Sequence, residues 1–272
     1  MSDLRKFLSI IATLLLVFAI ACGGGQETVY DDEEEDEGGE EVATATSADT
    51  AQPGAPATAD AGNVSGVVKL AGTPAAMPNV AMGADPACHQ QHPTPAKSNE
   101  VVVSADGGLA NVFVYVRPQD VKGSYPAPKT EALLDQVGCL YKPHVHAVHV
   151  GQTLKIRNSD PTLHNVHALA KANPEFNIGQ PVQGMESQKK FDKPEILIKI
   201  KCDVHGWMNS YLAVMPHPFH SVSNDGGAFN ISNLPAGTYT LEAWHEKFGT
   251  QSQQITVGPN ETAQVSFTFN AS

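Results

Sequence analysis

Four side chains in the second half of the chain could together hold a soft metal ion. Cys202, His205 and Met208 lie at i, i+3 and i+6, so a tight loop leaving a strand can turn all three toward one point. His164 supplies a second imidazole from an upstream polar turn. Sulfur ligands with imidazole favour copper, and two histidines, a cysteine and a weak axial methionine are typical of an electron-transfer copper site. Zinc is disfavoured, because structural zinc sites use cysteine and histidine without a thioether.

Each of these residues also has a purely structural interpretation. A free cysteine such as Cys202 is commonly buried without a role, and Met208 beside Trp207 could simply fill a core. His167 competes with His164, because the two are only three positions apart. The ligand set His164, Cys202, His205 and Met208 is the preferred interpretation.

A cluster of three other histidines, at 144, 146 and 149, is a weaker candidate for a second metal site. His144 and His146 share one face of a predicted strand, whereas His149 lies on the other face. Exposed or hydrogen-bonded strand histidines therefore explain this cluster better than a metal does. No role is assigned to His217, His220 and His245.

The ligand segments resemble the cupredoxins, and within them the amicyanin-like proteins. The resemblance is carried by HNVH at 164–167, by C-x2-H-x2-M at 202–208 and by the lead-in at 148–158, and it covers roughly residues 138–216. It implies a Greek-key β-sandwich with one type 1 copper. It also implies that Asn165, directly after the first histidine, ties the ligand loops together by hydrogen bonds.

The elements that must position these ligands are short strands. Runs of 5–8 residues rich in β-branched and aromatic side chains are separated by Gly, Pro and Asn, which predicts an all-β chain. The only helix candidate is 129–136. The expected strands are 63–70, 100–104, 111–116, 144–150, 153–158, 165–170, 195–201 and 210–215.

A final block predicts a second, smaller β-sandwich. G-x-F-x-I from Gly227 is followed by L-P-x-G-x-Y from Leu234, and two more strands follow up to Asn270. This block resembles the carboxypeptidase regulatory-like, transthyretin-like domains, which begin with strands like 64–70 and 111–116. The resemblance implies a discontinuous sandwich of 63–121 and 217–272, with the cupredoxin domain at 122–216 inserted in it. A tandem order, with strands 101–116 in the copper domain, is the alternative.

The first 62 residues read as a targeting signal and a tether. Arg5 and Lys6 precede an apolar run too short for a comfortable membrane span, and Cys22 follows small residues and precedes three glycines. We expect residues 1–22 to be a lipoprotein signal with Cys22 as the lipid-bearing residue. The alternative is an ordinary signal or anchor with an incidental cysteine. Either interpretation places the remainder of the chain outside the cytoplasm. The lipoprotein interpretation places it in a bacterial cell envelope, facing the periplasm or the outer surface, with the lipid as its membrane contact.

Charge separates this tether from the rest of the chain. Of the formal net charge of −12, residues before Asn63 contribute 13 acids and 2 bases, whereas 63–272 contain 16 acids and 15 bases. Segment 23–62 is predicted to be a disordered acidic linker, because it cannot bury enough apolar surface to offset its chain entropy. A calcium-binding or partner-docking role is the alternative. A nearly neutral remainder without a basic stripe excludes nucleic acid as a partner.

Cysteine arithmetic predicts one disulfide. With Cys22 lipidated, Cys88 and Cys139 remain in polar loops where they can pair, which leaves Cys202 odd in an oxidising compartment. An unpaired thiol is a liability there unless it binds a metal. The count therefore supports Cys202 as a ligand.

A redox partner is expected to dock where His205 reaches the surface. Gly206 leaves room for its approach, and an apolar rim is expected from Trp207, Pro216, Pro218 and Phe219. The resemblance implies a c-type cytochrome or another periplasmic redox protein as the partner.

Enzyme chemistry is not expected, because the chain shows no paired carboxylates and no nucleophile–base arrangement. The alternatives to electron transfer are a copper-binding or copper-handling protein without a redox partner, and an interaction module in which the copper fold is vestigial.

Overall fold

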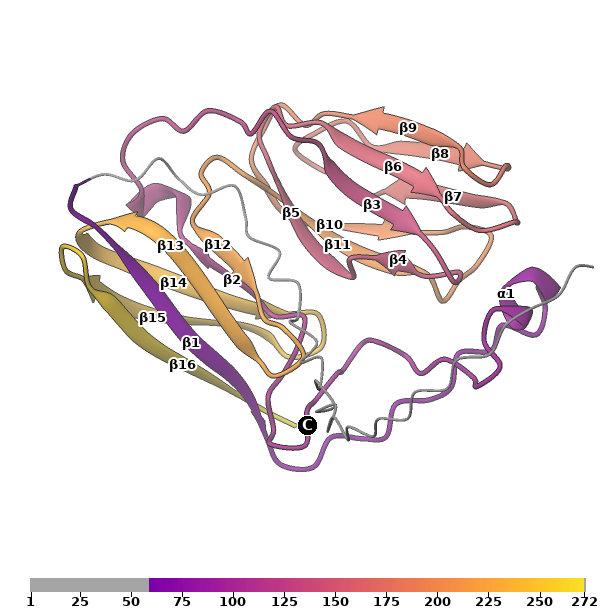
Figure 1. Cartoon of the computed structure of the whole chain (residues 1–272), viewed down its shortest axis with the longest axis horizontal. Coiled ribbons are helices and arrows are strands. Elements are labelled where there is room, and N and C mark those ends of the chain that lie inside the picture. Colours follow the sequence, from indigo (N-terminus) through magenta and orange to yellow (C-terminus); the bar gives the residue numbers. More distant parts are fainter. Residues whose placement is uncertain (1–58, 272) are drawn as a thin grey trace, which may run out of the picture. The chain divides into compact units, whose positions relative to one another are not determined.

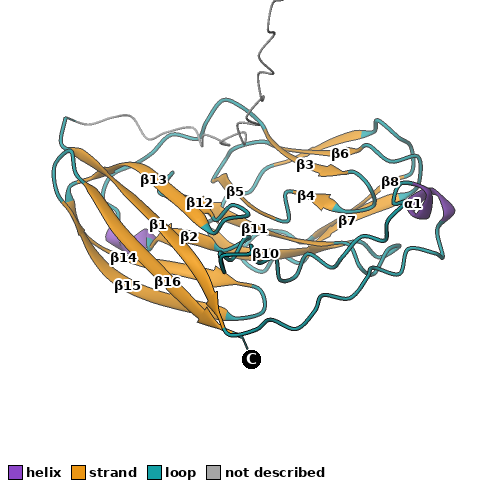
Figure 2. Ribbon diagram, turned by 60° about the horizontal axis from the view of Figure 1, so that its bottom comes forward, coloured by secondary structure: helices purple, strands orange, loops and turns teal. Residues whose placement is uncertain are grey.

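The computed structural model describes residues 59–271, and nearly all of its regular structure is β-strand. Figure 2 shows the strands in orange. Besides these strands, residues 59–271 form one short α-helix and one 3₁₀ turn. The predicted all-β class is therefore confirmed. Among residues 59–271, no helix is long and apolar enough to cross a membrane. The predicted signal, Cys22 and most of the linker lie outside the described residues.

One β-sandwich contains the predicted ligands. Its five-stranded sheet has the order β5-β11-β10-β7-β8, and its four-stranded sheet has the order β4-β3-β6-β9. The core between them holds Leu134, Ile156 and Ile200 together with Cys202 and Met208. The strands are β3 (Ala132–Gln136), β4 (Tyr141–Lys142), β5 (Val145–His149), β6 (Leu154–Asn158), β7 (His164–Ala168), β8 (Phe176–Gln180), β9 (Glu186–Lys189), β10 (Glu195–Lys201) and β11 (Asn209–Met215).

The second sandwich takes strands from both ends of the described chain. Its sheets have the orders β13-β1-β16 and β12-β2-β14-β15, and the indigo strand β1 lies between β13 and β16 in Figure 1. Its core is rich in Val, Leu and Phe, including Phe229 and Phe267. The strands are β1 (Ala61–Ala71), β2 (Phe113–Val116), β12 (His220–Val222), β13 (Ala228–Pro235), β14 (Gly237–His245), β15 (Gly249–Val257) and β16 (Thr262–Asn270).

Two of the sequence-based element predictions are wrong. Segment 129–136 is not a helix, because Ala132–Gln136 forms β3, which pairs in parallel with β6 and buries Leu134. Segment 100–104 is not a strand but makes only an isolated bridge, Val103 to Leu109, across the glycine turn at 107–108. Tertiary pairing overrides local propensity at 129–136, whereas segment 100–104 has no continuous strand partner.

The one α-helix within residues 59–271 was not predicted from the sequence. Helix α1 (Pro86–Gln90) begins after Asp85, whose Oδ1 accepts hydrogen bonds from Ala87 N and Cys88 N. An aspartate followed by proline is a helix-start signal, because the carboxylate caps free amides and proline suits the first helical position. The 3₁₀ turn η1 (Pro118–Asp120) was missed as well.

Candidate metal centre

The predicted ligand loop closes a β-hairpin. β10 and β11 pair antiparallel with Lys201 opposite Asn209, so residues 202–208 form the turn between them. Cys202 N donates to Met208 O at 3.1 Å, and Met208 N donates to His205 O at 2.9 Å. These bonds draw Cys202 and Met208 together at the base of the loop, where both are buried.

Three of the four predicted ligands converge. His164 opens β7, which pairs with β10, and its Nδ1 lies 2.9 Å from Nδ1 of His205. The Cys202 Sγ lies 4.0 Å from the same His205 nitrogen. One ligand atom from each residue lies within 4.8 Å of the other two. Such separations suit one ion at bond lengths of about 2.0–2.3 Å. Met208 lies in the same core as Cys202.

Each of the two histidines is oriented by a carboxylate. His164 Nε2 lies 2.9 Å from Asp160 Oδ2, and His205 Nε2 lies 2.9 Å from Asp85 Oδ2. Metal-binding histidines usually donate their second N–H to such a group, which fixes ring orientation and tautomer. Both rings thereby turn Nδ1 toward Cys202. Neither Asp85 nor Asp160 was predicted, although each stands directly before a proline in a polar turn.

The hydrogen bonds of the two rings favour a cation between their Nδ1 atoms. Because both Nε2 atoms donate to carboxylates, two neutral rings would face each other with Nδ1 lone pairs only 2.9 Å apart. A proton on one ring relieves this repulsion in the metal-free protein, and a metal ion would replace it. Burial alone lowers the pKa of His164, but its hydrogen bonds to Asp160 and Cys202 outweigh burial and raise the pKa to about 9.

The Cys202 thiol is prepared to ionise. Burial raises its pKa, but interactions with His164 and with nearby backbone groups outweigh burial and lower the pKa below its ordinary value. His205 N donates to Sγ at 3.3 Å. Asn165 Oδ1 lies 3.3 Å from Sγ and accepts a bond from Asp203 N at 2.7 Å, so this residue ties the two ligand segments together, as the resemblance implied.

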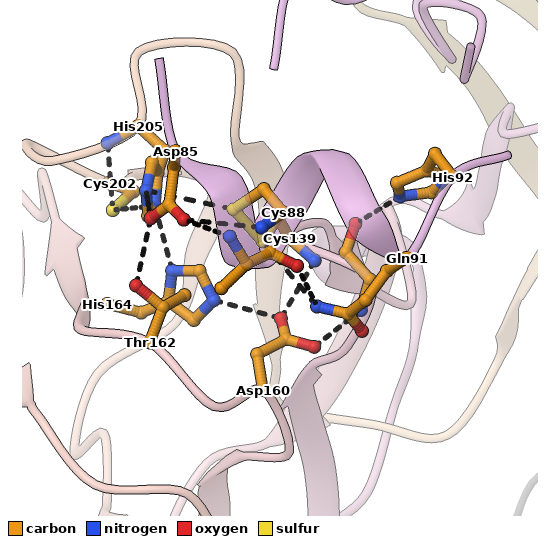
Figure 3. Close-up of a disulfide and its surroundings, with 12 residues drawn as sticks. Asp85, Cys88, Gln91, His92, Cys139, Asp160, Thr162, His164, Cys202 and His205 are labelled. Atoms are coloured by element: carbon orange, nitrogen blue, oxygen red, sulfur yellow. Dashed lines mark hydrogen bonds and ion pairs between the residues drawn. A yellow bond between two sulfur atoms is a disulfide. The ribbon is translucent and has the colours of Figure 1, made fainter. Parts of the chain in front are cut away.

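The predicted disulfide is present and lies against the centre. Cys88 in α1 is bonded to Cys139, and both are fully buried. The Cys88 Sγ lies 3.8 Å from His205 Nε2. Figure 3 shows the disulfide with Asp85, Asp160 and both histidines around it. Among the described cysteines, Cys202 is the free one.

The predicted exit patch agrees with the structure at Gly206 and Trp207 but not at His205. Gly206 is exposed and Trp207 is half-buried, with its ring centroid 4.9 Å from that of His205. His205, however, is only 3% exposed, because Asp85 and Cys88 cover the ring edge that was expected at the surface.

The other half of the predicted rim is wrong. Phe219 is fully buried in the core of the second sandwich, so it cannot line a surface patch. Pro216 follows the far end of β11, and at about 3.3 Å per residue that strand carries the chain about 20 Å from the loop. Spacing along the chain hid this separation.

The remaining histidines do not join the centre. His167 faces Asp203 and Glu175 at 2.9 Å each, which engages both its ring nitrogens outside the centre. His144 bonds Asn209 O and Glu246. Within residues 59–271, no group of three close ligand atoms includes His144, His146 or His149, so the second-site hypothesis gains no support.

Comparison with known proteins gives one family match. Residues 215–270, which contain β12 to β16, match the family model of the carboxypeptidase regulatory-like domain. No curated protein sequence matches the chain.

Solved copper proteins are similar to part of the chain. A copper-containing nitrite reductase from Thermus scotoductus is 20% identical over 36% of this chain and 25% of its own, with a TM-score of 0.30. A Cu(I) mutant of amicyanin is 21% identical over 31% of this chain and 82% of its own, with a TM-score of 0.28. A purple cupredoxin from Nitrosopumilus maritimus is 20% identical over 31% of this chain and 99% of its own, with a TM-score of 0.27. Similarities at TM-scores this low carry no weight for function, which is inferred from the centre itself.

Proposed function

We propose that His164, Cys202, His205 and Met208 hold one type 1 copper ion and that the protein carries single electrons. The observation that carries this proposal is the pair of buried imidazoles with Nδ1 atoms 2.9 Å apart beside a buried thiol, each ring held by a carboxylate on its outer nitrogen. A bound copper ion would supply the one-electron couple between Cu(I) and Cu(II).

The contribution of the chain is a ligand geometry that changes little between oxidation states. Cys202, His205 and Met208 are fixed by the β10–β11 hairpin, and His164 is fixed by β7 in the same sheet. Asn165 joins the two ligand segments through Asp203 N. Side chains held in this way need little rearrangement, because packing and outer hydrogen bonds already define their positions.

Nucleophilic chemistry by the thiol is a poorer explanation of the same residues. A cysteine with a lowered pKa beside a histidine with a raised pKa also occurs at catalytic thiols. Such a thiol must reach a substrate, yet Cys202 is only 3% exposed and His164 is fully buried. We therefore propose a binding protein rather than an enzyme.

Copper storage or handling without a redox partner is the second candidate. The covered ring edge of His205 favours it, because a closed centre suits slow release better than rapid exchange of electrons with a partner. A reduction potential in the range of known electron carriers and a fast reaction with a small cytochrome would separate electron transfer from handling. A folded protein that binds no copper would support a pure interaction module.

For electron exit, the remaining candidates are Trp207 and Gly206. The Trp207 ring packs on His205 and is itself half-buried, so it links the covered imidazole to the surface beside the exposed Gly206. The partner we propose, a c-type cytochrome or another periplasmic redox protein, comes from the resemblance. Weak redox encounters use small interfaces, which suits a patch centred on these two neighbouring residues.

The location we propose is the bacterial cell envelope, with a lipid on Cys22. The supporting features are the apolar run, the small residues before Cys22 and the acidic linker after it. A disulfide among the described residues suits an oxidising compartment. Metabolic labelling with a fatty acid, lost in Cys22→Ala, tests the anchor.

One visible spectrum tests the copper centre. The copper-loaded protein should show an intense thiolate-to-copper charge-transfer band, which should vanish in Cys202→Ser and in His164→Gln. His167→Gln is the matched histidine control and should keep the band, because His167 bonds Asp203 and Glu175 instead. A wild-type protein that binds copper and stays colourless would contradict a type 1 centre.

A further inference from the structure

The two carboxylates that orient the histidines are both held by one disulfide. Cys88 N donates to Asp85 Oδ1 at 3.2 Å, with Ala87 N at 2.8 Å. On the other side, Cys139 N donates to Asp160 Oδ2 at 2.8 Å, and Gly138 N donates to Oδ1 at 2.7 Å. We call Asp85, Cys88, Cys139 and Asp160 the disulfide clamp. Each half of the clamp consists of one cysteine and the aspartate that binds one histidine (Figure 3).

One half of the clamp comes from a segment with little regular structure of its own. Between β1 and β2 the described chain forms only the five-residue helix α1 and isolated bridges. A single turn of helix is not stable by itself in water. The covalent bond to Cys139 is therefore the strongest restraint that keeps Asp85 over His205.

The clamp also closes the centre. Asp85 Oδ2 contacts both His205 Nε2 and Thr162 Oγ1, and so bridges the loop with the turn that precedes His164. With Cys88 Sγ packed against the same imidazole, His205 and Cys202 are each only 3% exposed.

We propose that the disulfide clamp is a positioning device for the metal centre: it aims both imidazoles at Cys202 and shields that thiol and His205 from solvent and small molecules. The role of the clamp at a copper site rests on the proposed function. Its shielding of Cys202 is a property of the metal-free protein and can be measured separately.

The oxidised state of the clamp matters as well as its position. Reduction by a dithiol adds two electrons and two protons to the S–S bond, leaves two thiols and converts the dithiol to its own disulfide. Those sulfurs lie in two further groups of close ligand atoms, Cys88 with Asp85 and His205, and Cys139 with Asp160 and His164. Free thiols at these positions would compete with Cys202 for the same histidines and for any thiophilic metal.

The decisive measurement is the alkylation rate of Cys202 by iodoacetamide in the metal-free, full-length chain, followed by peptide mapping so that Cys22 is counted separately. Labelling of a buried thiol requires local opening, so we expect about a tenfold or greater rise in Cys88→Ala/Cys139→Ala. In Asp85→Ala, which retains the disulfide, the alkylation rate of Cys202 should also rise several-fold. Asp85→Asn keeps one carbonyl oxygen for hydrogen bonding, so its alkylation rate should lie between those of wild type and Asp85→Ala.

Asp225→Asn is the control, because it removes the same charge from an exposed turn in the second sandwich. It should label at the wild-type rate. Equal rates in wild type, Asp85→Ala and the double variant would overturn the proposal, and Asp85→Ala decides the outcome if the double variant does not fold.

A second readout separates this proposal from the proposed function. Copper-loaded Asp85→Ala should show a shifted charge-transfer band and faster loss of copper to a chelator, whereas Asp225→Asn should match wild type. If wild type takes up no copper but the alkylation order holds, the clamp stands and the copper function fails. If copper binds normally and the band, the chelator rate and the alkylation rate are all unchanged in Asp85→Ala, the clamp fails and the copper function stands.

Discussion

Two groups of buried histidines in this protein have opposite surroundings. His164 and His205 each have a carboxylate on Nε2 and a close neighbour at Nδ1. His146, His217 and His245 are buried too, but the Nε2 of each has no hydrogen-bond partner among residues 59–271. Burial accordingly lowers the pKa of each of these three core histidines to about 4.

The contrast shows which surroundings suit a buried histidine for metal binding. Desolvation acts on both groups and by itself only favours the neutral ring. At His164 the interactions with Asp160 and Cys202 outweigh desolvation, and they fix which nitrogen faces the centre. The core histidines lack this partner and act as polar packing residues.

Removal of the disulfide should affect the site histidines and spare the core group. For a crosslink between residues 51 apart, Cys88→Ala/Cys139→Ala should lower the free energy of unfolding by about 4 kcal/mol in the chain-entropy account. Urea unfolding measures this loss. In the imidazole proton spectrum, His205 should shift while His245 stays in place. A loss below about 1 kcal/mol would contradict the clamp as a major restraint.

Acid should act on the core histidines through their lowered pKa values. His245 has a folded pKa of about 4 against an ordinary 6.5, so the unfolded chain takes up its proton first and stability falls as pH drops from about 6.5 to 4. His245→Phe removes this dependence, and its ring fits between Phe248 and Phe269. Between neutral pH and pH 4, the free energy of unfolding of the variant should rise by roughly 2–3 kcal/mol relative to that of wild type.

The pH series itself supplies the control for His245→Phe. Above the ordinary pKa both states leave the ring neutral, so at neutral pH the variant should differ from wild type only through packing and through loss of the bond that Lys247 N donates to His245 Nδ1 at 3.1 Å. Urea midpoints measured at both ends of the range decide this. A stability difference that stays constant with pH would show that His245 does not titrate as its burial implies.

Conversion of a site histidine toward the core type should weaken metal binding. Asp160→Asn removes the anionic partner of His164 Nε2, and loss of such outer partners costs about 10–100-fold in metal affinity. Competition with a chromophoric chelator gives the affinity for copper, and Asp225→Asn is again the matched control. An unchanged affinity would mean that Asp160 serves the backbone at 138–139 rather than the metal centre.

The smallest expected effect concerns the exposed neighbour of the site histidines. Nothing lies within 4 Å of a Cβ added to Gly206, so Gly206→Glu fits without strain and adds a charge beside Trp207. The visible band should survive, while the rate of transfer to a small cytochrome should fall several-fold. Gln254→Glu adds the same charge on exposed β15 and should leave the rate unchanged. An equal fall in both variants would indicate a general charge effect and no local exit patch.

Local sequence patterns are sufficient to predict the fold class and the candidate ligands. Strand-length runs of β-branched residues between turn signals specify β-structure locally, and a C-x2-H-x2-M spacing places its three side chains on one short loop whatever surrounds it. Pairing of Cys88 with Cys139 followed from counting cysteines. All of these rest on short-range pattern or on composition, which a chain carries without its tertiary contacts.

The groups that surround the candidate ligands are set by long-range contacts. Asp85 lies 120 positions from His205, and nothing in the local pattern at either residue specifies that contact. The same is true of Phe219, which spacing placed near the loop and which packing buries in another core. Such long-range contacts depend on the summed burial and pairing of whole sheets. A residue's neighbours within a segment could therefore be predicted here, whereas the groups that cover it from other segments could not.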